Sequence, residues 1–140
     1  MDKKYKLTAE TINVNGKTLY RIEALKDFSD VKQGEKGGYV EKEENLSQYG
    51  DCWAYDNAKI YGDAEVYDDA IVYEDAVVCG NAKVYGKTDV CGNCWIRDDA
   101  EVYDNAIVCG HAKVYDNAKV RGDAVVHGDA EVFGNAVVCD

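Results

Sequence analysis

An uninterrupted six-residue repeat runs from Asp51 to Asp140 and limits the possible folds more than any other feature of the sequence. Its consensus is Ala-x-Val-x-Gly/Asp-Asn/Asp, and ninety residues divided by six give fifteen repeats. A period of six does not match the period of about 3.6 residues of an α-helix. The two apolar positions lie two residues apart, so they share one face of a β-strand. Glycine, aspartate and asparagine tolerate tight turns, so each unit is predicted to be a short strand followed by a sharp corner.

Such a strand cannot bury its apolar face alone, and the units are therefore predicted to stack as the coils of a solenoid. The pattern resembles the hexapeptide-repeat family, whose fold is a left-handed parallel β-helix of triangular section. This resemblance covers about two-thirds of the chain. It implies an all-β protein with three repeats per turn and about five triangular coils. The left hand comes from the resemblance, because the spacing alone also fits a β-solenoid of another cross-section.

The N-terminal segment does not follow the repeat. Asn15-Gly16 lies between two stretches of alternating apolar residues, which is a strong signal for a β-hairpin. Gly37-Gly38 marks a further turn. A solenoid exposes an unpaired strand edge at each end. We therefore expect residues 1–45 to form a small N-terminal β cap and residues 46–140 to form the β-helix.

The net charge of −11 belongs entirely to the repeats. Residues 1–45 hold nine basic and nine acidic side chains, whereas residues 46–140 hold seven basic and eighteen acidic ones. This excess argues against direct binding to nucleic acid or to an anionic membrane. The six cysteines replace other residues within the repeat pattern, which indicates a reducing compartment. With no signal peptide or membrane-spanning stretch, a cytoplasmic location is expected, in the host cytoplasm if a phage encodes the chain.

Residues 18 positions apart are expected to stack, which sorts the outward side chains into three faces. One face is mostly apolar, aromatic, Cys or His, which is unusual for a surface in contact with water. We predict that it is an interface, either with a second copy of the chain or with a different protein; the resemblance implies a trimer, and a dimer is the alternative. Its predicted contact residues are Trp53, Tyr55, Ile71, Tyr73, Ile107 and Val125.

Most acidic residues of the repeats fall at the corners. Turn chemistry explains them in part, because Asp bonds readily to nearby backbone. A functional alternative is that rows of negative charge imitate nucleic acid and bind a basic nucleic-acid-binding protein. The chain also resembles short repeat proteins of phages and gut bacteria, which suggests a phage inhibitor of a host defence nuclease, similar to an anti-CRISPR. The corner acids chosen for this role are Asp68, Asp69, Glu74, Asp75, Asp98 and Asp99.

Catalysis is the minority interpretation. The family's best-known members are acyltransferases that use acetyl-CoA and a histidine as general base, in a cleft helped by a loop inserted between coils. Only His111 and His127 are available here, and no loop interrupts the repeats. Both are weak candidates for a base. We therefore expect a non-catalytic binding module without a cofactor or metal.

Overall fold

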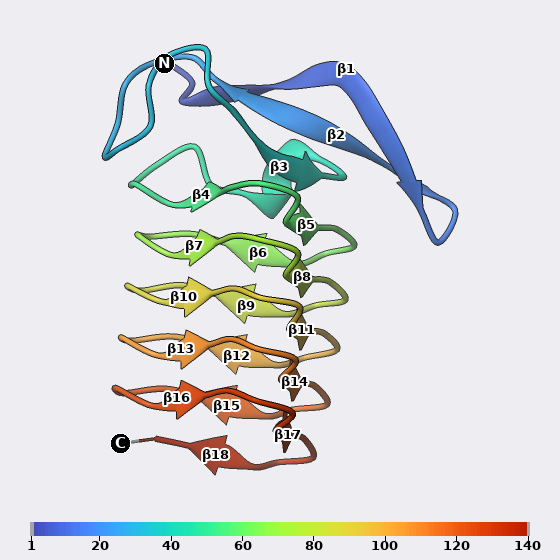
Figure 1. The fold of residues 1–140 in the computed structure, drawn as a ribbon, viewed down its shortest axis with the longest axis vertical. Coiled ribbons are helices and arrows are strands. Elements are labelled where there is room, and N and C mark those ends of the chain that lie inside the picture. The colour runs from blue at the N-terminus through green and yellow to red at the C-terminus, as the bar shows by residue number, and fades with distance from the viewer. Residues whose placement is uncertain (1, 140) are drawn as a thin grey trace.

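A computed structural model describes residues 2–139 and shows a three-sided β-solenoid, with its axis vertical in Figure 1. Two of its sheets have five parallel strands each, and the third has eight strands. The first face consists of β4, β7, β10, β13 and β16. The second face runs in the order β1-β2-β3-β5-β8-β11-β14-β17, and the third face consists of β6, β9, β12, β15 and β18. The all-β solenoid predicted from the repeat is confirmed.

Each repeat contributes one short strand to one face. The strands of the first face are Trp53–Ala54, Ile71–Val72, Asp89–Val90, Ile107–Val108 and Val125–Val126. Those of the second face from β5 onward are Lys59–Ile60, Val77–Val78, Trp95–Ile96, Lys113–Val114 and Glu131–Val132. Those of the third face are Glu65–Val66, Lys83–Val84, Glu101–Val102, Lys119–Val120 and Val137–Val138. Neighbouring coils pair residue i with residue i+18, such as Glu65 with Lys83.

The interior is a stack of small and branched apolar side chains. The alanine of each repeat and the Val or Ile two positions later are buried through most of the solenoid. Thr88 takes an alanine position, and its buried Oγ1 has no hydrogen-bond partner. The interior is therefore almost purely apolar, and burial of this surface together with the backbone ladder between coils holds the fold.

The corners adopt a left-handed backbone at one position in every repeat. From Gly50 to Gly134 every sixth residue has a positive φ, between 58° and 74°. Nine of these fifteen positions are glycine, and the others are Asp56, Asp68, Glu74, Asp98, Asp104 and Asp116. Because side chains rarely tolerate this region, the choice of Gly or Asp at the corner is a backbone requirement.

The N-terminal segment contributes an antiparallel hairpin and one further parallel strand. β1 (Tyr5–Val14) pairs with β2 (Lys17–Ala24) across Asn15-Gly16, where both φ angles are positive. β2 pairs antiparallel with β3 (Lys36–Val40), and β3 pairs in parallel with β5. The second face thus has six parallel strands, and the solenoid has about six coils instead of the five expected.

The expectation of a turn at Gly37-Gly38 was wrong. Both glycines lie inside β3, where the strand presses on the coil beneath. A Cβ on Gly38 would lie 2.6 Å from the carbonyl oxygen of Ala58, and one on Gly37 would lie 2.8 Å from the Trp53 ring. The pair is therefore required by a close approach between strand and coil.

Polar side chains finish the upper end of the solenoid. The ammonium of Lys4 is buried and donates to the carbonyl oxygens of Cys52 at 2.6 Å and Gly50 at 3.2 Å. Asn45, the last residue of a short 3₁₀ helix (Glu43–Asn45), donates to the carbonyl oxygens of Gly62 and Ala64. These bonds satisfy backbone acceptors that no further coil reaches.

Candidate functional site

Trp53, predicted to be an interface residue, is enclosed within the chain. Its side chain has no exposed surface, because the rings of Tyr5 and Phe28 pack against it edge to face. The ring centroids lie 5.9 Å and 5.1 Å from that of Trp53, respectively. Trp53 is therefore unavailable to a second chain, which corrects the prediction at this position.

Tyr55 also contacts the N-terminal segment. Its hydroxyl donates to Asp30 at 2.7 Å, so the upper part of the first face is partly engaged by the N-terminal segment. Below it, Ile71, Tyr73 and Ile107 are half-buried, and Val125 is 52% exposed. The apolar surface left to a partner is therefore the lower part of the first face.

Asp89 is the single Asp, Glu, Lys or Arg among the ten outward positions of the first face. It stands between Ile71 and Ile107 in the strand register, is half-buried, and makes no ion pair within residues 2–139. Burial raises the pKa of this carboxyl above its ordinary value. The face is thus apolar enough to disfavour charge, and a partner that buries it must offer Asp89 a hydrogen-bond donor or keep it protonated.

The corner acids divide into two groups. Asp68, Glu74 and Asp98 occupy the left-handed corner position, and each carboxylate accepts the backbone N–H of the residue eighteen positions later. The N···O distances are 3.1, 2.8 and 3.1 Å, respectively. The same bond recurs at Asp56, Asp104 and Asp116. All six non-glycine residues at this position therefore join one coil to the next.

The other corner acids follow one residue later and face solvent. Asp69, Asp75 and Asp99 are exposed, and among them Asp69 accepts a 3.3 Å hydrogen bond from the backbone N–H of Asp51. Four of the six acids predicted to meet a basic partner, namely Asp68, Asp69, Glu74 and Asp98, thus also bond to a neighbouring coil. Imitation of nucleic acid stays a prediction, and Asp68 and Glu74 remain exposed although each accepts a backbone N–H.

The two histidines lie at different kinds of position. His127 is exposed on the first face, and His111 is exposed at the corner between the first and second faces. Within residues 2–139 no hydrogen bond or ion pair joins either imidazole to a carboxylate. Neither imidazole is therefore oriented by a carboxylate of the described residues.

A groove that the sequence did not point to lies beside His111. It is lined by Asn93, Trp95, His111, Lys113, Asp129 and Glu131. Trp95 is 38% exposed and stands on β11, one strand above Lys113. The sequence did contain one indication of this groove. Trp95 stacks in the same outward column as Lys59, Val77, Lys113 and Glu131, and it is the one aromatic residue among these five.

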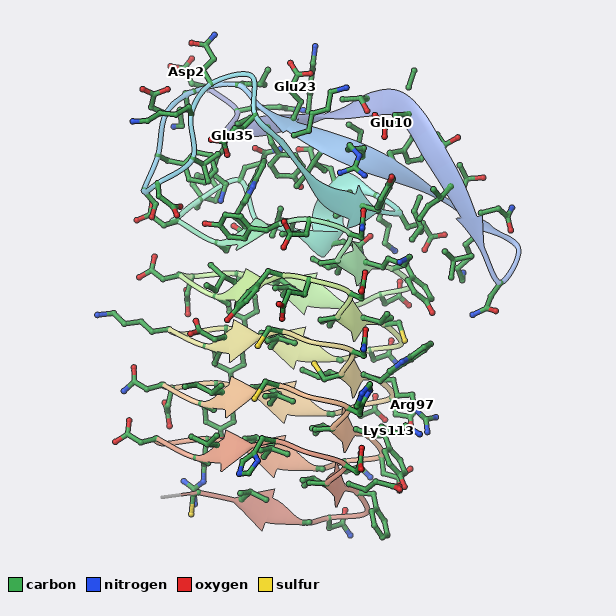
Figure 2. The ribbon with its side chains drawn as sticks, in the orientation of Figure 1. Asp2, Glu10, Glu23, Glu35, Arg97 and Lys113 are labelled. Atoms are coloured by element: carbon green, nitrogen blue, oxygen red, sulfur yellow. The ribbon has the colours of Figure 1, made fainter. Side chains whose placement is uncertain are left out.

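The hairpin divides the second face into a covered part and an open part. Leu19 of β2 packs in one apolar cluster with Tyr39, Tyr61, Val77 and Cys79. Below this cluster Arg97 lies over the Tyr115 ring, with its guanidinium carbon 4.5 Å from the centroid. Figure 2 shows Arg97 and Lys113 on the side of the solenoid below the hairpin tip. The open part is thus a mixed aromatic and charged surface.

The third face carries a ladder of stacked tyrosines. The Tyr67 and Tyr85 ring centroids are 4.8 Å apart with planes 3° from parallel, and those of Tyr85 and Tyr103 are 5.1 Å apart at 4°. Glu101 accepts a 3.0 Å hydrogen bond from the Tyr85 hydroxyl and lies 3.9 Å from the Lys119 ammonium. The ladder is a direct product of the 18-residue register, and its middle ring, Tyr85, is stacked on both sides.

No cluster of three or more His, Cys, Asp or Glu side chains suited to a metal ion occurs within residues 2–139. Over the same residues no helix is long and apolar enough to span a membrane. All six cysteines are unpaired, and Cys52 and Cys94 are fully buried in the interior. Burial raises the pKa of the Cys94 thiol to about 12, so this sulfur is a packing group and not a nucleophile at neutral pH.

Comparison with known proteins finds two similarities. A family model described as the YdcK beta solenoid repeat matches residues 64–80, which span β6 to β8. A protein of Escherichia coli (strain K12) named "Uncharacterized acetyltransferase YdcK" is 45% identical over 42 residues. The match covers 30% of this chain and 13% of the relative's length. Both findings agree with a β-solenoid of hexapeptide type.

Proposed function

We propose that this chain is a non-catalytic binding module that associates with a second copy of itself through the lower part of the first face. The observation that carries the proposal is an apolar column on an otherwise acidic solenoid, in which Ile71 and Ile107 are half-buried and Val125 is exposed. Two copies of an acidic rod repel each other over most of their surfaces. The first face is where they can meet with the least repulsion, because Asp89 is its one charged residue.

The solution mass, measured by light scattering, tests this proposal. The wild type is expected to be a dimer or trimer, and Ile71→Glu/Ile107→Glu is expected to be a folded monomer, because four or six buried carboxylates would be introduced at the contact. Lys83→Gln/Lys119→Gln on the third face is the matched control, since it changes the net charge by the same −2. A monomeric wild type, or a control that dissociates as readily, would refute self-association.

Acyl transfer is a second candidate, supported by the name of the E. coli relative and by the position of His111 in a groove with Trp95 and Lys113. Lys113 could pair with a phosphate and Trp95 could stack on the heterocycle of an acyl donor such as acetyl-CoA, while Asp129 and Glu131 of the same groove oppose the phosphate. Calorimetric titration with acetyl-CoA tests it. Saturable binding that is lost in His111→Ala but kept in His127→Ala would support transfer in this groove. Absence of binding at millimolar ligand would exclude it.

A further inference from the structure

The tyrosine ladder ends at Tyr67, where the next position holds a serine. Leu46 forms a parallel bridge with Val66, and the backbone N–H of Ser47 donates to the Val66 carbonyl at 2.9 Å. This register places Ser47 one strand above Tyr67, as Tyr67 is one strand above Tyr85. A ring at Ser47 would be the next rung of the ladder, but the serine side chain is too short to fill it.

The space that the missing ring leaves is a hollow in the surface. Its lining consists of Glu44, Ser47, Glu65, Val66 and Tyr67. The Tyr67 ring is half-buried, and its far side is fixed by the stacked ring of Tyr85, 4.8 Å away. A ligand that stacks here meets a platform that is already ordered, so little side-chain entropy is lost on binding.

The charges around the hollow are negative. Glu44 and Glu65 are both exposed, and neither makes an ion pair within residues 2–139. The neighbouring Glu43 is neutralised by Lys3 at 2.9 Å and does not line the hollow. No basic side chain lines it. The face of a tyrosine ring also attracts cations, because its π-electrons are negative.

We propose that the hollow between Ser47 and Tyr67 binds a small planar aromatic cation, whose ring takes the place of the missing rung above Tyr67. Stacking on Tyr67 supplies the orientation, and the carboxylates of Glu44 and Glu65 select a positive charge. The site lies on the third face, so it is independent of self-association through the first face.

Binding of 1-methylquinolinium to the full chain, measured by fluorescence quenching at neutral pH and low salt, tests the proposal. We expect saturable binding that weakens about tenfold in Tyr67→Leu, the loss expected for one aromatic stacking contact. Tyr103→Leu, at the opposite end of the same ladder, is the matched control and should leave the affinity within about twofold. Uncharged quinoline should bind about tenfold more weakly than the cation.

Two further variants separate a binding defect from a folding defect. Ser47→Tyr supplies the missing rung from the chain itself and should abolish binding while the protein melts at the wild-type temperature or above. Glu44→Gln/Glu65→Gln should weaken binding and remove its salt dependence. The proposal is overturned if the cation fails to bind, if quinoline binds equally well, or if a folded Ser47→Tyr variant binds as the wild type does.

Discussion

The upper end of the molecule and the repeated coils below it are built on different principles. The coils repeat one set of backbone bonds and one carboxylate-to-backbone bond at the corners. The upper end depends on contacts that occur once, such as the buried ammonium of Lys4 and the amide of Asn45. A periodic sequence is sufficient for the first kind of order, whereas the second kind needs particular residues at particular places.

One contact shows how the two regions are joined. The carboxylate of Glu41, just after β3, accepts the backbone N–H of Gly62 at 2.8 Å. Corner acids make the same kind of bond between coils, but Glu41 is 21 residues away from its donor and not eighteen. The upper end therefore makes the same kind of contact as the coils but with a different residue spacing.

The largest difference in stability between the two regions is expected when a glycine is replaced by alanine. Gly37→Ala should destabilise the protein by about 3 kcal/mol, because the new Cβ would collide with the Trp53 ring and the coil backbone. Gly128→Ala in the last coils meets no atom within 4 Å, and only its positive φ of 66° opposes it. Its cost should be about 1 kcal/mol. Urea unfolding of both variants measures the difference, and an equal loss would mean that β3 can move away.

Within the coils, the two kinds of corner acid should separate clearly. Asp98→Ala should cost about 2 kcal/mol, since it removes a charged acceptor from the Asp116 N–H and places alanine in a left-handed backbone. Asp99→Ala, one residue later and exposed, should change stability by less than about 0.5 kcal/mol. Thermal unfolding of the two single variants is the measurement. Similar melting temperatures would show that the inter-coil bond contributes little.

The interior of the coils can be tested by measuring how stability falls at alkaline pH, where the thiol of Cys94 ionises. Burial raises the pKa of this thiol from 9.0 to about 12. A group with a raised pKa in the folded state contributes stability that is present below pH 9.0 and is lost as pH rises toward the folded value. The expected slope is about 1.4 kcal/mol per pH unit.

Cys94→Ala should reduce the loss of stability with pH, since alanine fills the same interior position in the coils above and below, and Cys52 and Cys79, whose pKa values burial also raises, should account for part of what remains. Cys139→Ala, which replaces an exposed thiol, should leave the slope unchanged. The urea midpoints of both variants between pH 8 and 11, with reductant present, supply the comparison. If Cys139→Ala flattened the profile as much, the slope would come from another group.

The smallest expected effect is a gain in stability. Thr88→Val keeps the shape of the side chain and removes a buried hydroxyl that has no partner, so it should stabilise the protein by about 1 kcal/mol. Thr88→Ala also removes the hydroxyl but leaves a gap, and should be close to neutral. Chemical unfolding distinguishes the two. A loss with valine would indicate that the hydroxyl finds a partner in solution.

Most of the solenoid could be predicted from the sequence because its order is periodic. The 18-residue spacing placed Tyr67, Tyr85 and Tyr103 in one column, and the structure stacks their rings. Gly and Asp at the corners indicated a turn, although the bond from each left-handed acid to the next coil was not foreseen.

The errors came from the segment that has no period. The 18-residue spacing predicts every outward position of a repeat to be exposed, and Trp53 was therefore assigned to the surface. The spacing carries no information on Tyr5 and Phe28, which cover Trp53. A step of eighteen residues back from Tyr67 would place Tyr49 above it, whereas the structure places Ser47 there. Because the register shifts by two residues at the first coil, the position above Tyr67 is filled by a serine and not by another tyrosine ring.

The register of eighteen residues also governs how such a chain can change its length. Removing eighteen consecutive repeat residues deletes one coil and leaves each column aligned, as when Ile71 would come to lie above Ile107 in place of Asp89. Removing six turns every later coil by one side of the triangle, so that strands of the first face would continue those of a different face. Deletions or insertions of eighteen residues therefore keep every side chain on its original face. Deletions or insertions of six residues move the later outward side chains to another face, while the interior pattern of Ala and Val stays intact.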